Sequence, residues 1–236
     1  MSTRAERRDT TEAAILDAGL RLIAEGGSDE LTVRGLAREL GLAPSALYRY
    51  VRSRDDLLHL LLRHAHNELA DDIEAAQAAL PPDDLRGRWR VFAHTLRNWS
   101  LAHRHEWILI QRTVVAGQEP VEEHTFRLHL ILLRLAATAE ATGVHPVVAP
   151  AHSTPVIPGL PGLLAAAGVQ VSEQTALAGL AAWHMLDGAI YAELLRLAGM
   201  ELVDADAYYA AMVSATELLI FGPPPPGPGV REPSGS

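Results

Sequence analysis

The segment LTVRGLARELGLAPSALYRYVRSRDDLL, Leu31–Leu58, predicts two short helices joined by a tight turn and followed by the start of a third helix. Apolar residues recur at helical spacing in its first part, so the first helix has one buried face. Thr32 is suited to cap the beginning of that helix, and Gly41 is suited to end it in the left-handed conformation. Pro44–Val51 is expected to form the second helix, because proline favours a first helical turn.

A helix, a glycine-containing turn and a short second helix rich in Arg, Tyr and Ser are typical of the helix-turn-helix motif. In that motif the second helix enters the major groove of DNA, and the first helix crosses the backbone. Arginine can bind guanine with two hydrogen bonds, whereas hydroxyl groups bind phosphates. The spacing alone also fits a helical hairpin without DNA binding. The expected contacts to double-stranded DNA are Thr32, Arg34, Pro44, Ser45, Leu47, Tyr48, Arg49, Tyr50 and Arg54.

The same region resembles the TetR/AcrR family of one-component transcriptional regulators. GLAPSALYRYVRSRDDLL is similar to the recognition segment of that family, LTVRGLARELG to the preceding helix, and AAILDAGLRLIAEGG, Ala13–Gly27, to the opening helix. The resemblance covers about residues 10–62, a quarter of the chain. Ala43 departs from it, because the family usually has Ser or Thr there. A hydroxyl group that caps the recognition helix and can contact phosphate is therefore missing.

The resemblance implies an all-α protein of about nine helices. Residues 1–52 would be a three-helix helix-turn-helix domain with a mobile arm at 1–8, and residues 53–222 a helical ligand-binding and dimerisation domain. It also implies a homodimeric regulator without cofactor or enzymatic activity, most simply a repressor that a small molecule releases from a pseudo-palindromic operator. Residues 223–236, rich in Pro and Gly, have the composition of a disordered tail.

The net charge of −9 is unevenly distributed, which matters for a protein expected to bind DNA. Residues 1–54 hold 9 Arg against 8 acidic residues, whereas the remaining residues hold 11 Arg against 21 acidic residues. Only the first segment is electrostatically suited to DNA, with Arg4, Arg7, Arg8, Arg34, Arg49, Arg52 and Arg54 as its candidate basic face. The expected number of phosphate contacts is therefore modest.

Six stretches after the motif predict further helices, and two of them are a helix that begins near Trp107 and an amphipathic helix over Glu119–Ala141. Ser53 and Asp56 have capping-box spacing, so a long helix is expected from Ser53 to Leu80. Leu85–Leu101 is rich in aromatic residues, which favours a buried helix or a pocket wall. A small apolar or aromatic effector is expected, because the middle helices carry surplus aromatic residues. The candidate pocket residues are Trp89, Phe92, Leu96, Trp99, Trp107, Gln111, Leu133, Trp183 and Asp187.

Gln174–Leu197 is apolar on nearly all sides, and a last helix with Asp204 or Asp206 as its cap follows. This pair resembles the terminal helices through which TetR-type subunits dimerise as a four-helix bundle. AAWHMLDG also resembles a WHG-type C-terminal domain, although Asp187 stands where a histidine usually precedes the glycine. Residues 143–161 predict a long loop, either a cover for a ligand entrance or a plain connector.

The composition and the absence of certain motifs argue against a membrane protein, a metalloprotein and an enzyme. There are no cysteines, and no apolar stretch forms a signal peptide or membrane span, so a soluble cytoplasmic protein is expected. His59 with His66, or His103 with His105, could be a metal pair, but neither has the supporting ligands of a metal site. A His/Asp-dependent enzyme using His184 or His103 with Asp187 would lack a nucleophile. A helical small-molecule-binding protein without DNA binding is the other alternative.

Overall fold

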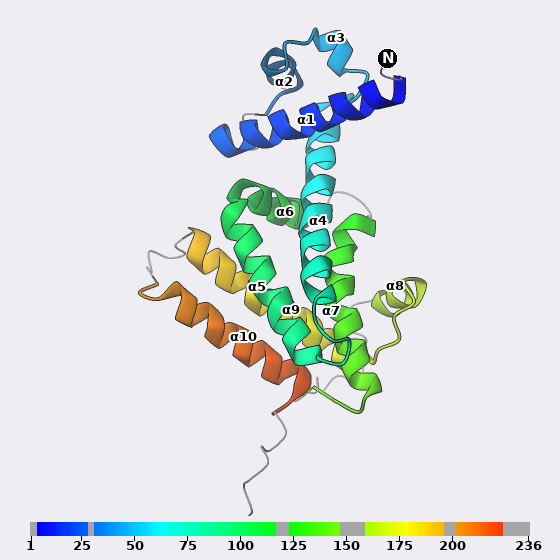
Figure 1. Cartoon of the computed structure of the whole chain (residues 1–236), viewed down its shortest axis with the longest axis vertical. Helices are drawn as coiled ribbons and strands as arrows, with labels where there is room; N and C mark the ends of the chain where they lie inside the picture. The colour runs from blue at the N-terminus through cyan, green and yellow to red at the C-terminus, as the bar shows by residue number, and fades with distance from the viewer. Residues whose placement is uncertain (1–3, 28–30, 117–122, 147–158, 196–201, 224–236) are drawn as a thin grey trace, which may run out of the picture. The chain divides into compact units, whose positions relative to one another are not determined.

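The computed structural model describes residues 4–27, 31–116, 123–146, 159–195 and 202–223, and these residues are helical apart from their connections (Figure 1). The helices are α1 (Arg4–Gly26), α2 (Val33–Glu39), α3 (Pro44–Leu47), α4 (Arg54–Ala78), α5 (Leu85–Ala102), α6 (Arg104–Ala116), α7 (Glu123–Ala141), α8 (Leu160–Ala166), α9 (Glu173–Leu195) and α10 (Ala205–Phe221). The predicted all-α class is confirmed. The helix that the sequence did not predict is α8, which begins within the stretch expected to be a loop.

The chain forms two compact units. Unit 1 comprises Met1–Ala76 and His94–Leu128, and unit 2 comprises Gln77–Ala93 and His129–Ser236. This division follows contacts within the chain and is not a test of the domain boundary expected at residue 52. That boundary stays a prediction. None of the helices in the described ranges is long and apolar enough to cross a membrane.

Helix α1 begins earlier than the sequence suggested. It starts at Arg4, so the expected arm at 1–8 is wrong for residues 4–8, while residues 1–3 lie outside the described ranges. The reason is local: Ala, Glu and Arg before Thr10 are good helix formers, so they extend the helix towards the N-terminus. At the other end Gly27 has a φ of +76°, a left-handed conformation that ends the helix.

The core of unit 1 lies between α1, α2, α3 and α4. Its fully buried side chains include Ile15, Ala18, Leu31, Leu36, Ala37, Leu47, Leu57 and Leu61. Gly19 allows the close approach of α1 to α4, because a Cβ at that position would lie 2.9 Å from the side chain of Leu61. The helix-turn-helix pair therefore packs on α1 and on the beginning of α4.

A break between α5 and α6 also lies in unit 1. Helix α5 ends at Ala102 and α6 begins at Arg104, so the helical conformation is interrupted at His103. The imidazole ring of His103 stacks on the indole of Trp99, with 4.7 Å between ring centroids and an interplanar angle of 10°. Farther along this unit, Arg127 on α7 donates to Asp71 and Glu74 on α4 at 2.6 and 2.7 Å.

Unit 2 is built around α9 and α10, which run side by side (Figure 1). Asp204 accepts a hydrogen bond from the backbone N–H of Ala207 at 2.8 Å, so it is the cap of α10. Near the other end of α10, the buried Glu217 accepts hydrogen bonds from Arg86 and Arg90 of α5. Arg86 also donates to the carbonyl groups of Phe221 and Gly222, so it fastens the end of α10 to α5.

The loop and tail predictions are only partly covered by the described residues. Residues 143–146 have no helical structure, residues 147–158 lie outside the described ranges, and α8 begins at Leu160. The predicted loop at 143–161 is therefore wrong at its end. Residues 224–236, which make up nearly all of the expected tail, also lie outside the described ranges.

Candidate nucleic-acid interface and effector region

The turn between α2 and α3 is fixed by hydrogen bonds at both ends of α2. The hydroxyl oxygen of Thr32 accepts from the backbone N–H of Gly35 at 3.0 Å, as predicted for an N-cap. At the C-terminus, Gly41 N–H donates to Arg38 at 3.1 Å, and Leu42 N–H donates to Ala37 at 2.8 Å. This pair of bonds is the Schellman arrangement, and it requires the left-handed conformation of Gly41, whose φ is +63°. The turn therefore sets the direction in which α3 leaves α2.

Helix α3 is shorter than the expected Pro44–Val51. Its α-helical part ends at Leu47, and residues 48–50 form a tight turn in which Tyr50 N–H donates to Leu47 at 2.9 Å. Tyrosine and valine are weaker helix formers than alanine or leucine, which agrees with the early end of the helix. Ala43 occupies the N-cap position and makes no side-chain hydrogen bond, as the missing hydroxyl implied. The recognition segment is thus one helical turn followed by a tight turn.

Six of the nine predicted DNA contacts have exposed side chains, namely Thr32, Arg34, Pro44, Ser45, Tyr48 and Arg49. Tyr48 is 45% exposed, which is unusual for a large aromatic residue. Leu47 lies on the opposite face of α3 and is 0% exposed, so its side chain packs in the core and cannot contact DNA in this structure. We therefore assign Leu47 a packing role.

The other two residues of the predicted set are partly buried. Tyr50 is half-buried in the tight turn, and Arg54 is half-buried at the beginning of α4. Nε of Arg54 donates to the carbonyl oxygen of Leu31 at 3.0 Å, so this arginine ties α4 to the residue before α2. Loss of Arg54 would disturb the geometry of the motif as well as any phosphate contact.

Two further exposed arginines lie beside the predicted set. Arg52 follows the tight turn, and Arg38 lies four residues after Arg34 on the exposed side of α2. The four-residue spacing could have identified Arg38 from the sequence, because residues i and i+4 share one helix face. Of the neighbouring acids, Asp56 is engaged locally: it accepts from Arg52 N–H at 2.9 Å, while its own N–H donates to Ser53 at 3.0 Å. The α2–α3 surface therefore exposes four arginines.

The predicted effector residues are divided between the two units. Trp89, Phe92, Leu133, Trp183 and Asp187 belong to unit 2, whereas Leu96, Trp99, Trp107 and Gln111 belong to unit 1. Asp187 is half-buried, and the other eight are buried. In unit 2, Phe92 lies 5.5 Å from Trp89 and 6.2 Å from Trp183 between ring centroids, and His129 lies 4.6 Å from Trp183. Sequence reasoning missed His129, which has no neighbouring pattern to mark it.

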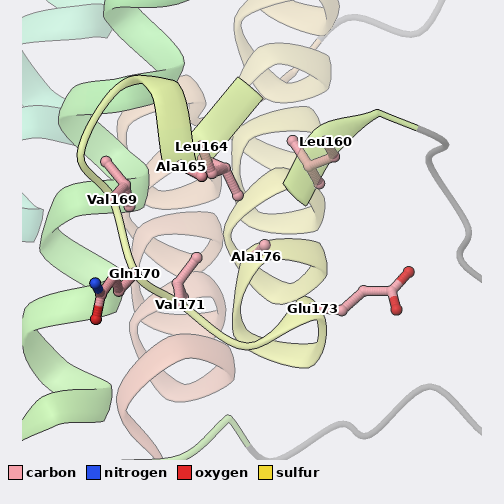
Figure 2. A pocket seen from close by; sticks show the side chains of 8 residues that line it. All are labelled: Leu160, Leu164, Ala165, Val169, Gln170, Val171, Glu173 and Ala176. Carbon is pink, nitrogen blue, oxygen red and sulfur yellow. The ribbon is translucent and has the colours of Figure 1, made fainter. Parts of the chain in front are cut away.

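Two features of unit 2 are relevant to ligand binding. The buried indole N–H of Trp89 has no hydrogen-bond acceptor, although buried donors are usually paired. Separately, a hollow of about 360 Å³ lies between α8 and the beginning of α9 (Figure 2). Figure 2 shows apolar side chains along it, including Leu164, Val171 and Ala176. None of the nine predicted effector residues lines this hollow.

Comparisons with known proteins agree with the structure of the motif. Residues 15–61 match the model of the family described as bacterial regulatory proteins, tetR family. The HTH-type transcriptional regulator Rv1816 of Mycobacterium tuberculosis is 34% identical over 122 residues, which are 52% of each chain. The chain thus spans about half the length of this relative and of the one from Mycobacterium bovis, HTH-type transcriptional regulator Mb1846.

Solved structures extend the similarity over most of the fold. A crystal structure described as that of regulatory protein SCO4313 has a TM-score of 0.67 and 25% identity, covering 91% of this chain and 98% of the other. A TetR family transcription regulator from Marinobacter aquaeolei VT8 has a TM-score of 0.62 at 18% identity, covering 92% of this chain and 98% of the other, and shows the fold alone. The family match covers the helix-turn-helix region, and the solved structures extend the similarity in fold over most of the chain, so residues 15–61 resemble the tetR family of bacterial regulatory proteins.

Proposed function

We propose that the protein is a homodimeric, sequence-specific DNA-binding regulator, and that α3 and the following tight turn read the major groove. The observation that carries the proposal is the division of α3 into two faces. Leu47 is buried, whereas Ser45, Tyr48 and Arg49 are exposed on the outside of the motif. A surface-exposed tyrosine and arginine on a rigid helix-turn-helix can contact phosphates and base edges.

The DNA proposal is tested by fluorescence anisotropy with fragments from upstream of the protein's own gene. Arg49→Gln should weaken binding by about 1–3 kcal/mol if Arg49 contacts a base, or reduce the salt slope by about 1 if it contacts a phosphate. Arg134→Gln is the matched control, because Arg134 is an exposed arginine on α7, outside the motif. Equal binding by both variants, or no binding of any such fragment at low salt, would count against the proposal.

We infer that two copies associate through α9 and α10. Both helices carry exposed apolar side chains, including Met185 and Leu195 on α9 and Tyr208 and Leu218 on α10, each at least 36% exposed. A Cβ at Gly188 would meet nothing within 4 Å, so α9 has open space for a close neighbour. Apolar helix faces of this kind pair with a copy of themselves in symmetric dimers. Dimeric helix-turn-helix proteins bind two half-sites about one turn of DNA apart, roughly 34–36 Å.

The dimer proposal is tested by light scattering coupled to size-exclusion chromatography. Leu218→Glu should give a monomer, because the carboxylate would have to be desolvated in the interface. Leu101→Glu is the matched control, since Leu101 is an exposed leucine on α5. A wild-type monomer would refute the proposal, as would a dimer that Leu218→Glu leaves intact.

The effector proposal is that a small apolar or aromatic molecule binds in unit 2 and releases the protein from DNA in the cytoplasm. Its support is the Trp89, Phe92 and Trp183 cluster, with the unpaired Trp89 N–H as a donor for one polar ligand atom. A ligand shifts the equilibrium only if it binds the released form more tightly. The distance between the two copies of α3 must equal the distance between successive major grooves. A small change in subunit separation would therefore weaken DNA binding.

The effector proposal is tested by tryptophan fluorescence during titration with a panel of apolar and aromatic compounds, and by anisotropy on bound DNA. A compound that quenches fluorescence and releases DNA supports it. Trp183→Phe should weaken the response, whereas Trp107→Phe in unit 1 should leave the affinity unchanged. Unchanged tryptophan fluorescence with every compound would refute the effector proposal without affecting the DNA proposal.

A further inference from the structure

Unit 1 contains a second hollow that the DNA proposal and the effector proposal do not use. It has a volume of about 440 Å³ and lies between α1, α4 and the junction of α5 with α6. Its apolar side comes from α1, which contributes Leu16 and Leu20, both half-buried, together with two alanines. We call this hollow the α1 groove. Every residue that lines it belongs to unit 1.

The charged side chains of the α1 groove are mostly acidic. Asp17 lies on α1, Glu68 on α4 and Glu106 on α6, and Arg21 is the one arginine among the residues that line the groove. Arg21 already donates to Asp17 and lies 3.8 Å from Glu39. The carboxylates of Glu68 and Glu106 therefore have no arginine among the lining residues to neutralise them.

Two histidines complete the rim of the α1 groove. His64 lies on α4, and His103 lies at the junction of α5 and α6, with Nδ1 4.0 Å from a carboxylate oxygen of Glu68. The stacking of His103 on the buried Trp99 holds its ring in place. Among the described residues no group of three or more His, Asp or Glu side chains has the arrangement of a metal site.

We propose that the α1 groove binds an amphipathic organic cation, an ammonium group attached to an apolar body. The apolar side of α1 provides surface for the hydrocarbon part, and the volume is in the range of small-molecule sites. Glu68 and Glu106 provide the charge complementary to the ammonium group. A ligand with a carboxylate would instead meet an excess of like charge, so the sign of the charge determines which molecules bind.

Occupation of the α1 groove would fix α1 against α4 and α6. Helix α1 packs on α2 and so supports the DNA-reading pair, which makes the groove a point where a ligand can influence DNA binding. Any such coupling is reciprocal: if the cation changes the affinity for DNA by some factor, DNA changes the affinity for the cation by the same factor.

The test is isothermal titration calorimetry on the full-length protein without DNA, using three probes with the same eight-carbon chain. Octyltrimethylammonium should bind saturably, and octanoate and octanol should bind at least about tenfold more weakly. Glu68→Gln and Glu106→Gln should each weaken binding of the cation up to about fivefold, because both carboxylates are partly solvated. Glu25→Gln, an exposed glutamate of α1 outside the groove, is the matched control and should have no effect.

The proposal is overturned if no saturable binding occurs, if octanoate binds as tightly, or if Glu68→Gln and Glu106→Gln bind like Glu25→Gln. Because no DNA is present, failure here would leave the proposed function untouched.

Discussion

Replacement of Glu217 by Gln should destabilise unit 2 by about 2 kcal/mol. The side chain of Glu217 is 11% exposed and accepts hydrogen bonds from Arg86 at 3.0 Å and from Arg90 at 2.6 and 2.8 Å. Removal of one member of a buried ion pair costs about 3–5 kcal/mol, whereas an exposed pair is worth at most about 1 kcal/mol. Arg86 is 24% exposed and Arg90 is 55% exposed, so the expected cost lies between these limits.

The size of the effect is reduced further by what remains in the variant. Arg86 keeps its hydrogen bonds to the carbonyl groups of Phe221 and Gly222, at 2.9 and 2.8 Å, so its charge is not left without partners. Arg90 can be hydrated, and the Gln amide oxygen can still accept one hydrogen bond. These contacts are why we place the cost near 2 kcal/mol and not at the upper limit.

The same contact predicts how the effect depends on pH. Burial alone would raise the pKa of Glu217, but the hydrogen bonds and charges of Arg90 and Arg86 outweigh burial and hold the pKa below its ordinary value of 4.5. A lowered pKa in the folded state means that the ionised carboxylate stabilises the fold above pH 4.5, and that this contribution is lost as the pH falls through the folded-state pKa. The stability difference between wild type and Glu217→Gln should therefore shrink below pH 4.5.

Urea denaturation at pH 7 and at a series of lower pH values, at one fixed protein concentration, measures both effects. Glu25→Gln is the control, because Glu25 is exposed and should give a change near zero at every pH. A loss of stability below about 0.5 kcal/mol at pH 7, or a difference from wild type that does not change with pH, would show that the ion pairs of Glu217 do not stabilise unit 2.

Three other substitutions have defined outcomes in the same denaturation assay. Thr32→Ala should lower the free energy of unfolding by about 1 kcal/mol, because Gly35 N–H loses its capping oxygen. An unchanged urea midpoint would show that the Thr32 cap does not stabilise the protein. Leu47→Ala should lower the free energy of unfolding by about 2–5 kcal/mol, because it leaves a cavity in the core. A loss of DNA binding without a loss of stability would instead show that Leu47 contacts DNA. Arg127→Gln should cost less than about 1 kcal/mol and lose even that effect in high salt, because Asp71 is mostly exposed; a larger, salt-independent cost would contradict this.

The sequence predicted the structure best at positions where one residue type caps or ends a helix. Thr32, Gly41 and Ser53 each have a short-range role that depends on residue type and spacing, and the structure confirms all three. The all-α class followed from the same periodicity. The beginning of α1 and the end of α3 were less predictable, because good helix formers continue before Thr10, whereas weaker helix formers follow Leu47.

Contacts between distant segments could not be predicted from the sequence. Nothing near Arg86 indicates that its guanidinium group meets Glu217 and the end of α10, 131 residues later. The candidate pocket residues were chosen for aromatic character, which marks burial but does not distinguish a core from a ligand site. The surface arginine Arg38 was recoverable from its spacing, whereas the burial of Leu47 depends on how α3 packs on its neighbours.

We propose that two copies of α3 enter successive major grooves of one DNA site, and hydroxyl-radical footprinting of the DNA upstream of the protein's own gene can detect both copies. We expect two protected patches on one face of the duplex, centred about 10–10.5 base pairs apart or at a multiple of that distance, and we expect Arg49→Gln to abolish them. A uniform pattern at low salt, or two patches that Arg49→Gln leaves unchanged, would contradict this proposal.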